Sequence, residues 1–325
     1  MKIFRFPFAG GPLGVPAARI LTPVMLLAGI YISSAQPDSP VIGRWDLTVS
    51  MDGRELPSWL EVKLSGQSTL VGYYVSFAGS ARPISEVHAD GGSFSFSLPP
   101  QWIGNHYMHV HGKVEGDTIS GELLYHTGTS HSFKGVRAPE LLREEPEAWT
   151  PARPLIADSG LDGWTTTPGS DTNQWEVVDG VLNSPASGAN LMTVEKFDDF
   201  KLHVEFRVPE GSNSGIYLRG RYEVQVEDSY GKQPESIYLG GVYGFLSPNE
   251  MAAARAGEWQ TYDITLVGRR VTVVLNGKTI IHRQIIPGIT GGALDSAEGE
   301  PGPIMLQGDH GPISYRNMTV SVPAN

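Results

Sequence analysis

The run from Tyr222 to Glu227 alternates strictly between apolar and polar residues, and this pattern constrains the fold more than any other stretch. Side chains on a β-strand point alternately to its two faces, so alternation predicts a strand with one buried face. Its apolar face would pack on a core: Tyr222, Val224 and Val226. Its polar face would carry two carboxylates and an amide in a row: Glu223, Gln225 and Glu227.

The polar face of this strand has two interpretations. It is a solvated exterior, the usual fate of alternating charge in an antiparallel sheet, or it is a functional surface. Arg219 and Arg221 precede the strand and would hold the carboxylates in a partly buried network. A bulge near Glu227 would also bring Asp228 onto this face, since bulges redirect side chains beside active sites.

Short alternating runs separated by Gly-containing turns continue along the chain, without a strong helical pattern. The length of 325 residues suits two domains, and 39 Gly and 24 Pro suit many turns. We predict an all-β protein. A smaller antiparallel barrel or sandwich over residues 41–137 and a Pro-rich linker over 138–154 would precede a two-sheet sandwich over 155–325.

Charge and composition exclude several classes of protein. The net charge of −11 argues against nucleic acid or an anionic membrane as the partner. The chain has no Cys, which excludes disulfides, thiolate nucleophiles and a lipoprotein anchor. Residues 1–35 have the pattern of an export signal, with basic residues, a short apolar run and small residues before Gln36. We expect a periplasmic or secreted protein, with an uncleaved anchor as the alternative.

Two groups of residues raise the question of a metal ion. Four histidines fall on or beside predicted strands of the first domain: His109, His111, His126 and His131. No Cys or closely spaced carboxylate completes a metal site there, so exposed strand residues are the simpler interpretation. A later loop carries Asp295, Glu298 and Glu300, whose spacing does not specify a Ca²⁺ site. We predict no functional metal and no required cofactor, and leave a structural Ca²⁺ open.

The second domain carries an ordered series of motifs. They include Phe200-Lys201-Leu202 with Glu205-Phe206-Arg207, Asn213-Ser214-Gly215-Ile216-Tyr217-Leu218-Arg219, Tyr222-Glu223-Val224-Gln225 with Asp228-Ser229, Gly257-Glu258-Trp259, and Leu306-Gln307 with His310-Gly311. Over residues 155–322, this series resembles the 3-keto-disaccharide hydrolase domain family, formerly a domain of unknown function. The departures are Gln260 and Tyr315, in place of the family's usual Asn and Phe, and Asp309 before the histidine. The resemblance implies a concanavalin A-like jelly-roll sandwich.

The resemblance also implies an activity, because some relatives act on glycosides oxidised to a ketone at C3. The ketone acidifies the hydrogen on C2, which a general base removes while donors stabilise the enolate. The oxygen on C1 then leaves with help from an acid, and water adds to the enone. We expect Glu223 or Asp228 as base or acid, and His310 as the partner group. A separate oxidoreductase would have to supply the ketone.

Further residues are expected to bind the sugar or its enolate: Arg219, Gln225, Glu205, Tyr217, Tyr243, Gln307 and Arg316. Two other functions stay open. The protein could be an ordinary glycosidase with paired carboxylates about 5–5.5 Å apart, although Gln225 occupies the central acidic position of that pattern. It could also be a non-catalytic carbohydrate-binding module, in which Tyr217, Tyr222, Tyr243 and Trp259 stack on sugar rings. We expect Trp259 to be core more than platform.

Overall fold

The structure is a computed structural model that describes residues 39–102, 104–170 and 172–324. The predicted all-β class is confirmed, since no helix occurs in the described residues. None of their segments is a helix with the length and apolarity needed to cross a membrane. The predicted export signal lies outside the described residues. Residues 38–325 form one compact unit.

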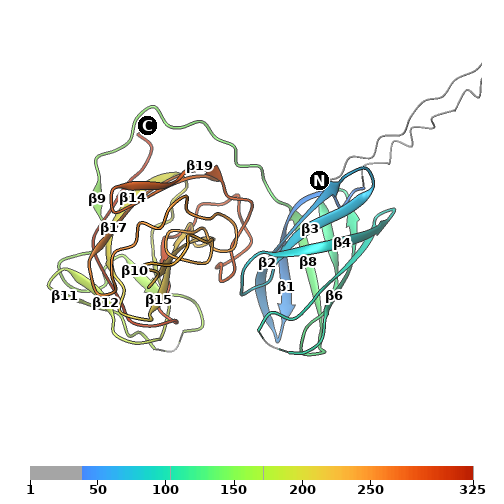
Figure 1. Cartoon of the computed structure of the whole chain (residues 1–325), viewed down its shortest axis with the longest axis horizontal. Helices are drawn as coiled ribbons and strands as arrows, with labels where there is room; N and C mark the ends of the chain where they lie inside the picture. The colour runs from blue at the N-terminus through green and yellow to red at the C-terminus, as the bar shows by residue number, and fades with distance from the viewer. Residues whose placement is uncertain (1–38, 103, 171, 325) are drawn as a thin grey trace, which may run out of the picture. The chain divides into compact units, whose positions relative to one another are not determined.

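The first eight strands form a closed antiparallel barrel, coloured blue to green in Figure 1. They are β1 (Gly43–Met51), β2 (Arg54–Ser65), β3 (Thr69–Val75), β4 (Arg82–Asp90), β5 (Ser93–Leu98), β6 (Met108–Glu115), β7 (Thr118–Leu124) and β8 (Ser130–Arg137). The barrel closes because β1 pairs with both β2 and β8. Strand β6 shows why the sequence forms a wall, since Met108, Val110 and Val114 are buried inside while its histidines are exposed.

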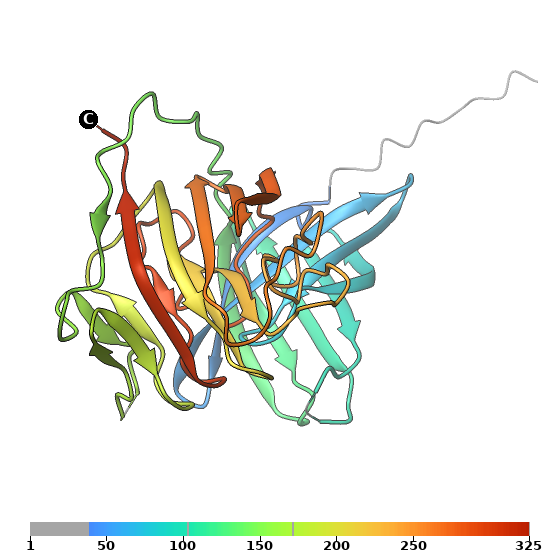
Figure 2. The ribbon, with the colours of Figure 1, turned by 60° about the vertical axis from the view of Figure 1, so that its left-hand side comes forward.

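The remaining strands form two antiparallel sheets around a second core. The five-stranded sheet has the order β10 (Trp164–Thr166), β13 (Leu191–Thr193), β20 (Met305–Leu306), β15 (Asn213–Leu218) and β16 (Tyr222–Glu227). The other sheet has the order β11 (Glu176–Val178), β12 (Val181–Ser184), β21 (Ile313–Ser321), β14 (Phe200–Arg207), β17 (Gln260–Val267), β18 (Arg270–Leu275) and β19 (Lys278–Ile285), with β9 (Arg153–Pro154) paired to β21. Figure 2 shows β21, in red, beside β14.

The Pro-rich segment between barrel and sandwich is extended and forms no helical turn. It is attached to the sandwich at several points. The Arg143 guanidinium contacts the carboxylates of Asp198 and Asp199, and the Leu141 carbonyl accepts a hydrogen bond from the Arg269 amide. The barrel residues Trp59 and Val75 belong to the hydrophobic core cluster of the sandwich. The two β structures therefore share buried surface.

Candidate functional site

Strand β16 places its polar residues on the face of the five-stranded sheet that points away from the sandwich core. Tyr222, Val224 and Val226 are fully buried in that core, as the alternation predicted. On the opposite face, Glu223 lies directly across from Tyr217 on β15, and Gln225 lies across from Gly215. The register continues without a break from Tyr222 to Glu227, so the predicted bulge near Glu227 is absent.

A loop segment extends this sheet beyond β16. The amide of Gln225 donates to the carbonyl of Gly241, and the amide of Tyr243 donates to the carbonyl of Glu223. Val242 is paired with Val224 and is buried in the same core. Because neighbouring residues of an extended segment alternate, Tyr243 lies on the Glu223 face. Glu223 is therefore flanked by two tyrosines, Tyr217 on one side and Tyr243 on the other.

The polar face is buried, which overturns the interpretation of a solvated exterior. Glu223 is 3% exposed and Gln225 is 4% exposed. The hydroxyl of Tyr217 donates to the carbonyl of Gly291 at 3.1 Å, and Tyr217 is itself only 2% exposed. The hydroxyl of Thr290, one residue earlier, accepts a hydrogen bond from the Glu223 amide at 3.0 Å. Loops that follow the strands in sequence therefore cover these residues.

Gly215 makes room for the carboxyl group of Glu223. A Cβ atom at position 215 would lie 2.2 Å from Oε1 of Glu223, far inside van der Waals contact. The carboxyl group thus leans over the neighbouring strand at a point where that strand has no side chain. This explains why the position is glycine although its backbone is ordinary strand.

The surroundings of Glu223 change its acidity. Burial raises the pKa of its carboxyl group from 4.5 to about 8, and the charge of Asp309 acts in the same direction. The nearby His310 opposes this rise without cancelling it. A carboxyl group with a pKa near neutrality can both accept and release a proton under ordinary conditions.

His310 and Asp309 form a pair in the loop after β20. Nδ1 of His310 lies 2.6 Å from Oδ1 of Asp309, and both side chains are about half exposed. The hydrogen bond to Asp309 raises the pKa of His310, and the charge of Glu223 adds to the increase, while partial burial opposes it. The pair lies close enough for its charges to act on the Glu223 carboxyl, and protonated His310 is a proton donor in this neighbourhood.

Three amide oxygens near this face have no hydrogen-bond partner although they are buried. They are Oε1 of Gln225, Oε1 of Gln307 and Oδ1 of Asn213. Asn213 lies on the same face of β15 as Tyr217, and Gln225 lies on the same face of β16 as Glu223. The backbone amide of Gln307 donates to the Gly215 carbonyl. Buried acceptors are costly when unpaired, so these oxygens are suited to the hydroxyl groups of a ligand.

Tyr243 adds a neutral donor to the same face. Burial raises the pKa of its hydroxyl to about 12, and the charges of Glu223 and Glu227 act in the same direction. The hydroxyl therefore keeps its proton at neutral pH. It can donate to an oxygen that becomes negatively charged beside Glu223.

Four predicted site residues lie elsewhere, and the first two are Asp228 and Arg219. Asp228 accepts a hydrogen bond from the Gly211 amide, and no bulge turns it toward Glu223. Arg219 is fully buried, and its guanidinium donates to the Tyr222 hydroxyl and to the Gly268 carbonyl on the core side of the sheet. Its backbone has φ 53°, a left-handed conformation in the turn after β15. Arg219 is therefore a structural residue with no surface for a sugar, and it does not pair with Glu223.

Glu205 and Arg316 belong to the other sheet. Nε of Arg316 donates to the Glu205 carboxylate at 2.7 Å, and its guanidinium stacks on Trp259 with 4.0 Å to the ring centroid. Arg207 contacts the same indole ring. Trp259 is partly exposed, so the expectation of a core tryptophan is wrong. These residues form a separate cluster, and the structure does not bring them to Glu223.

The histidines of the barrel and the acidic loop do not make a metal site. Within the described residues, no group of three His, Cys, Asp or Glu side chains could hold a metal ion. Glu298 contacts Arg269 and accepts from the Tyr222 hydroxyl, while Asp295 accepts from Arg221. The carboxylates of Asp295 and Glu298 are thus engaged by arginines, and they do not fit a Ca²⁺ ion.

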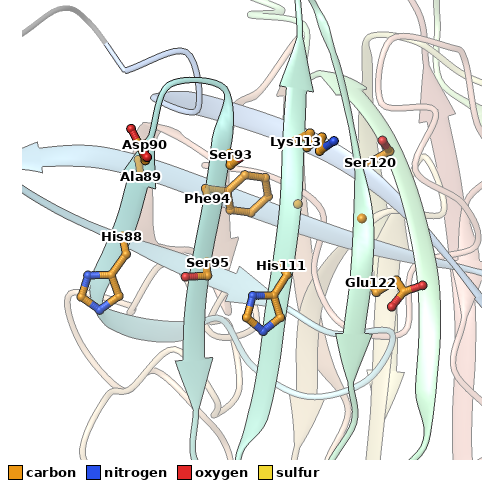
Figure 3. Close-up of a pocket in the computed structure, with 12 residues that line it drawn as sticks. His88, Ala89, Asp90, Ser93, Phe94, Ser95, His111, Lys113, Ser120 and Glu122 are labelled. Atoms are coloured by element: carbon orange, nitrogen blue, oxygen red, sulfur yellow. The ribbon is translucent and has the colours of Figure 1, made fainter.

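A shallow hollow of about 560 Å³ lies on the wall of the barrel. Figure 3 shows His88, Ser95, His111 and Glu122 in a row across four neighbouring strands, in agreement with their pairing register. The ionisable side chains that line this hollow are all exposed to solvent. The buried carboxyl and the unpaired acceptors lie at Glu223 instead, so we place the candidate site there.

Two contributors to the site were not predicted from the sequence. Asp309 stands out in the sequence only as a departure before His310, yet an Asp–His pair in a Gly-rich loop is a usable signal for an oriented imidazole. Asn213 stands out only as part of a motif. Asn213 lies on the same face of β15 as Tyr217, because the two residues are four positions apart and every second side chain of a strand points to the same face.

Comparison with known proteins identifies the second domain. The sequence model of the 3-keto-alpha-glucoside-1,2-lyase-like domain matches residues 151–321. No curated protein matches the chain. Among solved structures, a candidate glycosyl hydrolase from Parabacteroides distasonis ATCC 8503 is 29% identical, with a TM-score of 0.46, covering 55% of this chain and 92% of its own. The carbohydrate-binding module CBM66 from Bacillus subtilis is 13% identical, with a TM-score of 0.31, covering 49% and 94%.

The family match spans just over half of the chain and contains β9 to β21. Glu223, Tyr217, Tyr243 and His310 all lie inside it. The barrel lies outside it, in agreement with the extent of the resemblance seen in the sequence. The chain therefore belongs to the family of 3-keto-alpha-glucoside-1,2-lyase-like domains.

Proposed function

We propose that this protein cleaves glycosides that carry a ketone at C3, with Glu223 as the base that removes the proton from C2. One observation carries the proposal. A carboxyl group with a pKa of about 8 lies buried between Tyr217 and Tyr243, within reach of the charges of the Asp309–His310 pair. Carboxylates act as the base at a carbon next to a carbonyl group in other enzymes, and burial makes Glu223 a stronger base than an exposed glutamate.

The elimination uses two proton transfers. Glu223 takes the C2 proton, and the electron pair of that bond moves to form the enolate with its charge on the C3 oxygen. The Tyr243 hydroxyl and the side-chain amide of Gln307 are the available donors for that oxygen. The enolate then reforms the ketone as the C1–O bond breaks, and His310 donates a proton to the departing oxygen. The sugar product is an enone. Water then adds its oxygen to C1 while His310 takes a proton from the water and Glu223 returns a proton to C2, which restores both groups and completes a hydrolysis.

Ordinary hydrolysis by paired carboxylates is less well supported. On β16 itself the next carboxylate on this face is Glu227, four residues along, which places the two Cα atoms about 13 Å apart. The Asp309 carboxylate is bonded to His310. Retaining enzymes need about 5–5.5 Å and inverting enzymes about 6.5–9.5 Å between their carboxyl groups. Glu227 also accepts from the Lys232 ammonium at 3.2 Å and from the Ser229 hydroxyl. It has partners of its own.

A sugar-binding module is the second candidate function. It is favoured by the unpaired amide oxygens of Gln225 and Gln307, which suit sugar hydroxyls with or without catalysis. A binder, however, has no use for a carboxyl group held at high pKa in a dry environment, because that arrangement costs stability. The raised pKa of Glu223 therefore favours the enzyme.

The deciding experiment compares a 3-keto-disaccharide with its unoxidised parent as substrates. Wild type should cleave only the keto sugar, and Glu223→Gln should lower the activity at least a thousandfold, since it has no base. Glu227→Gln is the matched control, because it makes the same change on the same strand face, and it should keep the activity. Cleavage of the parent sugar would replace the proposal with an ordinary glycosidase. Binding without any turnover would replace it with a binding module.

The setting of the reaction is part of the same proposal. We propose that residues 1–35 direct export, so that the protein works in the periplasm or outside the cell. The chemistry requires a separate glycoside 3-oxidoreductase upstream, because nothing in the proposed steps oxidises C3. Neither step needs a metal ion or an organic cofactor.

A further inference from the structure

The loop between β3 and β4 of the barrel borders the Glu223 site. The amide of Gly292 donates to the carbonyl of Phe77 at 3.0 Å. A Cβ atom at Gly291 would lie 2.1 Å from the Gly79 carbonyl oxygen, so the two backbones are in direct contact. On another side, a Cβ atom at Gly244 would lie 2.7 Å from the Ala81 amide. The loop therefore contacts two separate segments of the sandwich.

Both of those segments belong to the proposed catalytic site. The Gly291 carbonyl accepts the hydrogen bond from the Tyr217 hydroxyl, and a Cβ atom at Gly292 would lie 2.4 Å from that hydroxyl. Gly244 directly follows Tyr243, whose amide is bonded to the Glu223 carbonyl. One layer of backbone thus separates the barrel loop from the two tyrosines beside Glu223.

The contact between barrel and sandwich is well packed. Trp59 of the barrel is fully buried and meets Phe245 edge to face, with ring centroids 5.4 Å apart. A Cβ atom at Gly288 would lie 2.2 Å from the same indole ring, so only glycine fits there. Such packing holds the barrel loop in one position beside the site.

The exposed surface beside this loop carries groups suited to a sugar. Trp102 is 65% exposed, and its ring lies close enough to Gly79 that a Cβ atom there would come within 2.9 Å. The amide of Gln101 donates to the Ser80 hydroxyl at 3.3 Å. Arg82 and Gln101 also line a small pocket of about 70 Å³, which has room for a ring substituent but not a whole ring.

We propose that Trp102, Gln101 and Arg82 form a subsite for the part of the glycoside beyond the reacting sugar. A large exposed indole is a flat apolar platform on which a second ring can stack, with polar groups at its edge for hydroxyls. The barrel, which lies outside the family match, would then determine which leaving group the enzyme accepts. This inference rests on the proposed function, because it assumes that the reacting sugar lies at Glu223.

The test measures binding to Glu223→Gln, which should hold substrate without converting it. Calorimetry would compare a 3-keto-disaccharide with a 3-keto sugar that carries only a methyl group at C1. Adding Trp102→Ala should weaken binding of the disaccharide about tenfold and leave the methyl glycoside unchanged. Tyr73→Ala is the matched control, since Tyr73 is an exposed aromatic residue on the same barrel. It should change neither affinity.

The subsite would be overturned if Trp102→Ala left the affinity for the disaccharide unchanged. It would also be overturned if the substitution weakened binding of the disaccharide and of the methyl glycoside equally. Failure of the chemistry is recognised separately, because wild type would then not cleave the keto sugar. In that case the calorimetric test of Trp102→Ala and Tyr73→Ala is repeated with the unoxidised disaccharide in place of the keto sugar. A Trp102-dependent loss that Tyr73→Ala does not produce would still support the subsite. No binding, or no such loss, would refute it.

Discussion

Replacing Glu223 with glutamine should abolish activity and, at the same time, stabilise the protein at alkaline pH. The carboxyl group has a pKa of about 8 in the folded protein and about 4.5 in an unfolded chain. Between these values the folded state keeps a proton that the unfolded state has released. Stability therefore falls as pH rises from about 4.5 to 8, and the loss persists above pH 8. Glutamine has the same shape and never ionises.

The size of the effect follows from the two pKa values. A pKa held near 8 instead of 4.5 corresponds to about 5 kcal/mol, at about 1.36 kcal/mol per pH unit. The difference in unfolding free energy between Glu223→Gln and wild type should thus grow by several kcal/mol between pH 4.5 and 8.5. In thermal unfolding this is on the order of 10 °C, since about 2–4 °C accompany each kcal/mol in a protein of this size.

The assay is thermal or urea unfolding of both proteins across that pH range. Another buried acid, Asp46, has a pKa raised to about 9 by burial and by the neighbouring Glu298, but it is present in both proteins and cancels in the difference. Glu227→Gln, the same substitution on the same strand face, is the control. Parallel stability curves for wild type and Glu223→Gln would show that the carboxyl group is not held protonated, and would remove the basis for a strong base at this position.

The remaining predictions concern activity and the reassigned Arg219. The value of kcat/KM for a 3-keto-disaccharide should follow a bell-shaped pH profile, because Glu223 must be ionised to accept a proton and His310 must be protonated to donate one, and a pH-independent rate would contradict these roles. Asp309→Asn should lower the pKa of His310 and move the alkaline limb of that profile to lower pH, whereas an unmoved limb would exclude His310 as the acid. Gly215→Ala should reduce kcat at least tenfold with the fold intact by circular dichroism, because the new methyl group would displace the carboxyl of Glu223; full activity would refute this packing argument. Arg219→Met should destabilise the protein by about 1–3 kcal/mol in urea unfolding, because the Gly268 carbonyl and the Tyr222 hydroxyl lose a buried donor. It should leave KM unchanged, and a raised KM would return Arg219 to the site.

Local sequence was enough to predict the Tyr222–Glu227 strand and its two faces. Period-two alternation is a property of the extended backbone, so it assigned Tyr222 to the core and Glu223 to the opposite face without any knowledge of the neighbours. The motifs of the second domain also identified the family. Of the predicted site residues, Tyr217, Glu223 and Gln225 lie together because they share two adjacent strands of one hairpin.

What covers each face depends on the folded chain as a whole. Glu223 is buried, and therefore has a raised pKa, because loops about 70 to 90 residues further along the chain fold over it. Arg219 sits in the turn after β15, where a left-handed backbone directs its guanidinium into the core, although its motif suggested a sugar-binding residue. Glu205 and Arg316 were grouped with the site by motif, yet they belong to the other sheet. Alternation specifies a side of the strand, but burial, acidity and partners depend on segments that are distant in sequence and meet only after folding.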